Sequence, residues 1–308
     1  MSNVTLASSE VKSFSLTFIF VYIACEIIVL ALHFVLQLVI YKLQTNDNQY
    51  HLIRMLSIVD STHCIFVIGQ GSYFIGAFNS GTLPNQTLMI IITLLIYIFH
   101  ASPMFVTVLI VIDRWIAVKY PLRYHALVSK RKINYTASIS VIFCTVILSC
   151  LFFAGGVSSI TTRSVFFTNR GTLSFFIILR TVTCATIIVL GKITIRLRDA
   201  SEANRPHARN LQGAEAERFD IIVELKRSVK DVFKFNIWTC VFIVPMIVIT
   251  LFLLVSDGSE TIFKLNFLFG LVNVLSNPIV YLTCFTKIRQ YWYRKLFQRG
   301  TINANETD

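Results

Sequence analysis

Seven apolar segments divide this chain, and each is long enough to cross a lipid bilayer. Only 14% of its 308 residues are charged, whereas soluble domains carry roughly a quarter of such residues. A helix needs about 20 apolar residues to span a bilayer, where its backbone must satisfy its own hydrogen bonds. We therefore predict an all-α membrane protein built as a seven-transmembrane helix bundle. The predicted spans are 14–41, 51–78, 88–112, 134–157, 172–195, 233–256 and 262–284.

Lysine and arginine residues concentrate on one side of these spans. The loops 119–133 and 196–232 and the tail from residue 285 hold most of them. The opposite side has only four, which are Lys12, Arg163, Arg170 and Lys264. Basic loops stay in the cytoplasm, so we expect a multi-pass plasma-membrane protein with an extracellular N-terminus. This topology accounts for the net charge of +12, and we predict no nucleic-acid partner.

The segment after the seventh span has an amphipathic pattern. Apolar side chains recur there at helical spacing, at Phe285, Ile288, Trp292 and Leu296, with basic residues off that stripe. The pattern predicts a helix that lies on the surface of the lipid bilayer. The predicted organisation is an extracellular N-terminus at 1–13, a seven-span domain at 14–284, the amphipathic helix at 285–297 and a cytoplasmic tail at 298–308.

Two short motifs lie at the ends of spans three and seven. Asp113-Arg114-Trp115 is followed by Tyr120-Pro121-Leu122, and Asn277-Pro278 precedes Tyr281. In this topology the two motifs resemble those of the rhodopsin-like (class A) family of G-protein-coupled receptors. The resemblance implies a receptor that transmits the binding of an extracellular ligand to a heterotrimeric G protein, without enzymatic activity of its own.

Several positions depart from the rhodopsin-like pattern. Span four has no tryptophan, span five has no proline, and the second outer loop has no cysteine for the usual disulfide to span three. Span six keeps Pro245, but Phe242-Ile243-Val244 precedes it where the family usually has Cys-Trp-x. These departures are similar to the divergence of large invertebrate chemosensory receptor families, with vertebrate pheromone receptors as the alternative.

The resemblance gives Arg114 the role of a switch. It implies that Arg114 pairs with Asp113 in the resting state and reaches an acid at the base of span six, for which Glu224 is the best candidate. The alternative is an interfacial anchor with snorkelling side chains. Proline kinks in spans six and seven would serve as hinges during activation. The predicted coupling residues are Asp113, Arg114, Tyr120, Pro121, Leu122, Glu224, Pro245, Asn277, Pro278 and Tyr281.

Span two contains a carboxylate, Asp60. An acid within the membrane is costly unless it is paired, hydrated or protonated. Asn273 and Asn277 are one turn apart on span seven and share a face. The resemblance implies that these three residues bind a sodium ion in the resting state. The alternative is a structural polar cluster without an ion, and we predict no other cofactor.

The resemblance places a ligand pocket between the outer halves of spans three, five, six and seven. Amine receptors of the family carry an acid at the position of Ile96, so we exclude a biogenic amine and expect another small molecule or a peptide. Arg180 lies roughly two turns into span five. It suits an acidic ligand or a buried acid partner, or else it snorkels or pairs helices. His100 is either a pocket residue or a packed core histidine.

Asn3 and Asn85 begin glycosylation sequons on the predicted outer side. No catalytic triad, nucleotide loop or metal cluster stands out in the sequence, and we predict that the protein is not an enzyme. Two other functions stay open. A transporter or channel would need a continuous polar path, and a non-signalling partner receptor would form heteromers without promoting nucleotide exchange.

Overall fold

The computed structural model describes residues 16–43, 48–82, 85–120, 123–154, 170–203, 214–255 and 260–291. Seven of its helices are long and apolar enough to cross a membrane, and the described residues contain no strand. The predicted all-α, seven-span fold is therefore confirmed. The helices are α2 (Leu16–Leu43), α3 (Asn48–Asn79), α4 (Gln86–Lys119), α5 (Tyr124–Leu127), α6 (Lys130–Ala154), α7 (Arg170–Ala203), α8 (Ala214–Val255) and α9 (Glu260–Cys284).

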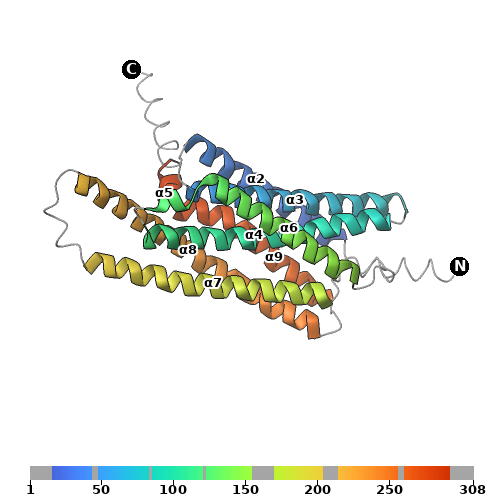
Figure 1. Cartoon of the computed structure of the whole chain (residues 1–308). Coiled ribbons are helices and arrows are strands. Elements are labelled where there is room, and N and C mark those ends of the chain that lie inside the picture. The colour runs from blue at the N-terminus through green and yellow to red at the C-terminus, as the bar shows by residue number, and fades with distance from the viewer. Residues whose placement is uncertain are drawn as a thin grey trace, which may run out of the picture.

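Three helices extend well beyond the apolar spans that were predicted for them. The third span was predicted to end at residue 112, but α4 continues to Lys119, where the Tyr120 amide still donates to the Ile116 carbonyl at 2.8 Å. Helices α7 and α8 extend past the rest of the bundle at one end (Figure 1). Hydropathy marks the part of a helix that lies in lipid, whereas helical hydrogen bonding continues into polar sequence.

A helical segment at 286–291 follows α9, directly after Phe285. Phe285 and Ile288, two members of the predicted apolar stripe, are buried in the main core cluster together with Tyr281 and Phe235. These two side chains thus pack on the end of the bundle. The other two members, Trp292 and Leu296, and the remainder of the predicted amphipathic helix lie outside the described residues.

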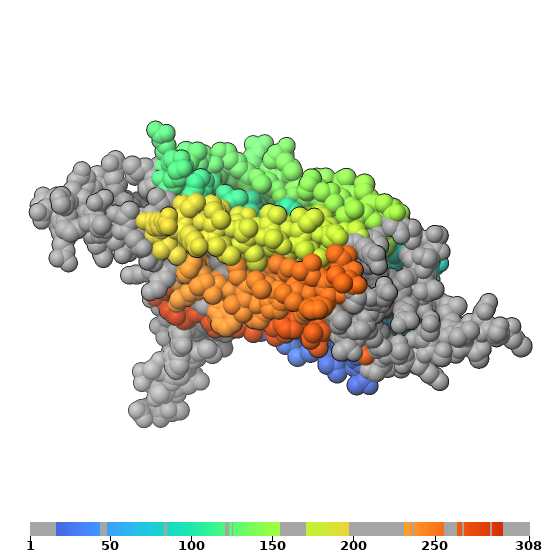
Figure 2. Space-filling view, turned by 90° about the horizontal axis from the view of Figure 1, so that it is seen from below, coloured from blue at the N-terminus to red at the C-terminus, as the bar shows by residue number. Residues whose placement is uncertain are grey.

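Helix α4 lies at the centre of the bundle and packs against α3, α6, α7 and α8. Along one face, α7 lies between α6 and α8 (Figure 2). Large apolar side chains point outward from these helices, among them Ile142, Val146 and Ile178. An apolar outer surface of this kind suits a hydrocarbon environment. The helical backbone suits it as well, because a helix satisfies its backbone hydrogen bonds internally. Arg114 lies near the end of α4 that faces α5, and we refer to this end of the bundle as the Arg114 end.

Candidate functional site

The Arg114 side chain is buried at the junction of three helices. Its Nε donates to Asp113 Oδ2 at 2.8 Å, and its Nη2 also donates to that oxygen. Its Nη1 donates to Gln49 Oε1 of α3 at 2.9 Å. Both Arg114 and Asp113 are only 3% exposed. Because charge is neutralised within the pair and the remaining donors find acceptors, this arrangement satisfies the guanidinium without solvent.

Tyr124 of α5 closes this group from the other side. Its hydroxyl donates to Asp113 Oδ1 at 2.6 Å and accepts from Arg114 Nη2 at 3.2 Å. A phenol is already protonated at neutral pH, and burial raises the pKa of Tyr124 further above its ordinary value, so the hydroxyl can donate here. We call Gln49, Asp113, Arg114 and Tyr124 the Arg114 cluster. The sequence identified its charged pair but missed the other two members, which no motif marks.

A small cavity lies beside Arg114, between α4, α7 and α8. It is partly open, has a cavity volume of about 20 Å³ and is lined by Val111, Gly191, Thr194 and Val232 among others. The predicted partner Glu224 is part of α8, but its side chain lies outside the described residues, as do Pro121 and Leu122. Tyr120 is exposed, with Lys119 Nζ 5.2 Å from its ring centroid.

Helices α8 and α9 are joined at the Arg114 end. Tyr281 is fully buried and stacks on Phe235 of α8, with 4.7 Å between ring centroids. Asp231 of α8 accepts hydrogen bonds from both the amide and the hydroxyl of Thr286, each at 3.0 Å. Two contacts of different chemistry therefore hold α8 against α9 and the segment 286–291. The predicted hinges Pro245 and Pro278 lie within α8 and α9, respectively.

The predicted sodium-site residues come together only in part. Asn277 Nδ2 donates to Asp60 Oδ2 at 2.9 Å. His33, which the prediction did not include, places its Nε2 3.8 Å from the same carboxylate. Asp60 Oδ1 and Asn273 Oδ1 are buried and have no hydrogen-bond partner. Oxygen atoms are the ligands that hard cations prefer, and sodium binding at these residues stays a prediction.

The three predicted ligand residues line one cavity. It has a cavity volume of about 90 Å³ and is partly open to solvent, and its lining includes Ile96, His100 and Arg180. Arg180 Nη1 donates to Thr250 Oγ1 of α8 at 2.6 Å, and Nη2 lies 3.0 Å from His100 Nε2. The guanidinium carbon lies 5.5 Å from the centroid of the Phe176 ring. We call this space the Arg180 cavity. Its lining is mainly apolar with a few polar groups, as is usual for sites that bind small molecules.

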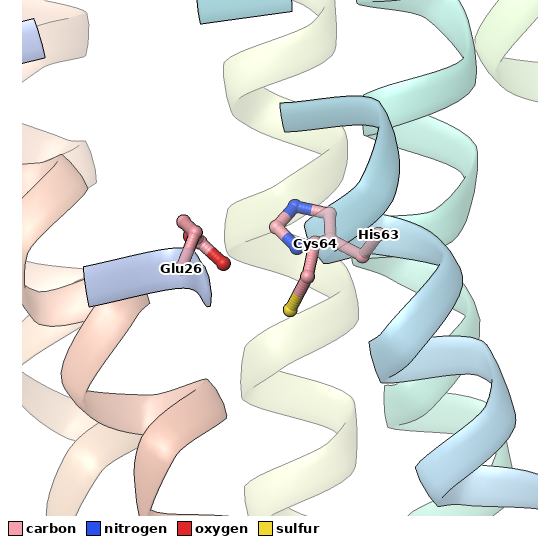
Figure 3. Close-up of side chains that lie close together, drawn as sticks. All are labelled: Glu26, His63 and Cys64. Atoms are coloured by element: carbon pink, nitrogen blue, oxygen red, sulfur yellow. The ribbon is translucent and has the colours of Figure 1, made fainter. Parts of the chain in front are cut away.

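A cluster of metal-ligating side chains lies next to this cavity. Glu26 of α2 faces His63 and Cys64 of α3 (Figure 3), and their ligand atoms lie within 4.8 Å of one another. His63 Nδ1 and both carboxylate oxygens of Glu26 are buried without a hydrogen-bond partner. Nitrogen, sulfur and oxygen ligands of this kind could hold a zinc ion. No metal-binding motif marks the cluster in the sequence, because its members come from two helices.

The two predicted glycosylation sites differ in what the structure describes. Asn85 is exposed and caps α4, since its Oδ1 accepts from the Leu88 amide at 3.2 Å. A helix cap of this kind satisfies a backbone donor that has no partner within the helix. Asn3 lies outside the described residues. Glycosylation at both positions stays a prediction.

Residues 85–173 match the family described as Caenorhabditis serpentine receptor-like protein, class xa. The matched segment runs from the start of α4 to the start of α7 and includes Asp113, Arg114 and Tyr124. We found no match among the curated proteins. Over this segment the chain is similar to an invertebrate receptor family. Together with seven apolar helices, the match supports a multi-pass membrane receptor of the serpentine type.

Proposed function

We propose that this chain is a plasma-membrane chemoreceptor that transmits ligand binding in the Arg180 cavity to a heterotrimeric G protein at the Arg114 end. The observation that carries the proposal is the Asp113–Arg114 pair of the Arg114 cluster. The pair is buried and neutralised, and it lies within the segment that matches a serpentine receptor family. An ionisable pair at the end of a membrane helix is expensive and is usually kept for a function. The chain itself performs no covalent chemistry in this proposal.

In the proposed topology the Arg114 end faces the cytoplasm. The contacts of Tyr281 with Phe235 and of Asp231 with Thr286 hold α8 against α9 in the resting arrangement. Outward movement of α8 would enlarge the small cavity beside Arg114. A ligand that binds more tightly to the opened arrangement shifts the population toward it. Arg114, released from its cluster, would then contact the G protein.

The Tyr124→Phe variant tests this proposal, because it removes one hydroxyl that closes the Arg114 cluster. We expect the variant, purified and reconstituted with a G-protein heterotrimer, to increase basal GTPγS uptake several-fold. Arg114→Ala should reduce uptake to the level measured without receptor. Tyr135→Phe is the matched control, because Tyr135 is 70% exposed on α6 and should leave uptake unchanged.

Basal uptake that is the same in wild type, Tyr124→Phe and Arg114→Ala across the G-protein subtypes would contradict coupling through this cluster. Solute flux into vesicles that contain no G protein would instead favour the transporter. The two results are distinguishable, because nucleotide exchange and flux are measured on separate preparations of the same protein.

A further inference from the structure

Arg180 is a buried cation without a carboxylate partner in the described part of the chain. The side chain is 3% exposed, and it contacts Thr250, His100 and the ring of Phe176. Arginine can only donate, so His100 Nε2 accepts in this contact and the imidazole is neutral. The Thr250 hydroxyl is also neutral. None of these groups cancels the positive charge.

The guanidinium also retains unused donors. Arg180 Nε is buried and has no hydrogen-bond partner. Of the five N–H groups of an arginine, the contacts with Thr250 and His100 engage two. An isolated charge within the membrane is unfavourable unless it is paired or reaches water. A side chain kept in this state is suited to bind a group that supplies both acceptors and negative charge.

The rest of the cavity constrains the shape and charge of that group. Val67, Ile96, Leu173 and Met246 give the lining a mainly apolar character. Among the described lining residues Arg180 has the only formal charge. The single positive charge of Arg180 is balanced by a single negative charge. A carboxylate also suits its geometry, because the planar carboxylate oxygens match the guanidinium donors. A phosphate monoester would bring a second charge that this lining does not neutralise.

We propose that the Arg180 cavity binds a monoanionic carboxylate with an apolar body, anchored by the guanidinium of Arg180. This inference deepens the proposed receptor function and rests on it for its biological role, although the binding itself does not require a G protein. Thr250 and His100 act as positioning residues, since their contacts fix the orientation of the guanidinium.

The first experiment measures binding with probes that share a chain length and differ in charge. Purified receptor in phosphatidylcholine nanodiscs is titrated with octanoate, octanol and octylamine, and its melting temperature is followed. Octanoate should raise the melting temperature, whereas octanol and octylamine should raise it less or not at all. Arg180→Gln should weaken the octanoate response at least tenfold. An equal response to octanol, no response to octanoate, or an unchanged response in Arg180→Gln would each overturn the proposal.

The second experiment needs no ligand. Arg180→Met removes an unpaired buried charge, so the ligand-free variant should melt at the same temperature as wild type or higher. A large drop in the melting temperature would mean that an acid of the chain pairs with Arg180, and would overturn the proposal. Octanoate binding that depends on Arg180 but never changes GTPγS uptake would leave the anion site standing and count against the receptor function.

Discussion

Two arginines are buried to the same extent in this protein, and they differ in what surrounds them. Arg114 and Arg180 are each 3% exposed. Arg114 contacts a carboxylate, an amide oxygen and a phenol, so its charge is neutralised within the chain. Arg180 contacts a hydroxyl, a neutral imidazole and an aromatic face. The comparison shows that Arg114 links α3, α4 and α5 through contacts that neutralise its charge, whereas the described contacts of Arg180 leave its charge without a neutralising partner.

The largest expected effect comes from removing the acid that neutralises Arg114. Asp113→Ala leaves a buried guanidinium without its counter-ion, and such a change costs about 3–5 kcal/mol. We expect a large fall in the melting temperature of the reconstituted protein. The double variant Asp113→Ala/Arg114→Met should recover most of the loss, because it removes the stranded charge as well.

Arg180→Met should instead leave the melting temperature unchanged or raise it. The contrast between this variant and Asp113→Ala is the most direct test of the comparison. If Asp113→Ala proves as mild as Arg180→Met, the two arginines do not differ in the way that their contacts indicate. If the double variant is no more stable than Asp113→Ala, the loss comes from packing rather than from an unpaired charge.

The sequence predicted the Arg114 pair and not the surroundings of Arg180, for a physical reason. Asp113 and Arg114 are neighbours on one helix, so their proximity follows from the chain itself. The seven spans were likewise predictable, because lipid requires long apolar helices whatever their packing. The contact between Asp60 and Asn277 joins residues far apart in the sequence and was anticipated only through the family resemblance.

Contacts that depend on how helices pack could not be predicted. Gln49 and Tyr124 reach Arg114 from α3 and α5, and neither belongs to a recognisable motif. Thr250 meets Arg180 across the interface of α7 and α8. Several roles for Arg180 stayed open from the sequence alone, because the choice between an acid partner and an acidic ligand depends on its neighbours in three dimensions.

An acid of the chain placed beside Arg180 should neutralise its charge, as Asp113 neutralises the charge of Arg114. Thr250 is buried and its hydroxyl lies 2.6 Å from Arg180 Nη1, so Thr250→Asp brings a carboxylate within reach of the guanidinium. We expect the octanoate affinity of this variant to fall at least tenfold, because its own carboxylate competes with the ligand. Titration of the melting temperature with octanoate measures the change.

Thr250→Asn is the matched control, because asparagine has the shape of aspartate without its charge. It should keep more of the octanoate response than Thr250→Asp, and its ligand-free form should be the less stable of the two. Equal losses of octanoate affinity in both variants would show that Thr250 matters for the shape of the cavity. They would contradict the claim that a carboxylate at this position competes with octanoate for the charge of Arg180.

The smallest expected effect concerns the contact that holds α8 near the Arg114 end. Asp231 accepts two hydrogen bonds from Thr286 and is half-buried. Asp231→Ala removes acceptors comparable to a helix cap, which is worth about 1 kcal/mol. We expect faster amide exchange in the segment 286–291 and a modest increase in basal GTPγS uptake, since one restraint on α8 is lost. This variant also serves as the carboxylate control for Asp113→Ala, because the amide and hydroxyl of Thr286 that bind Asp231 are both neutral. A fall in the melting temperature as large as that of Asp113→Ala would mean that loss of any carboxylate at this end destabilises the bundle. The large effect of Asp113→Ala could then not be assigned to the unpaired charge of Arg114.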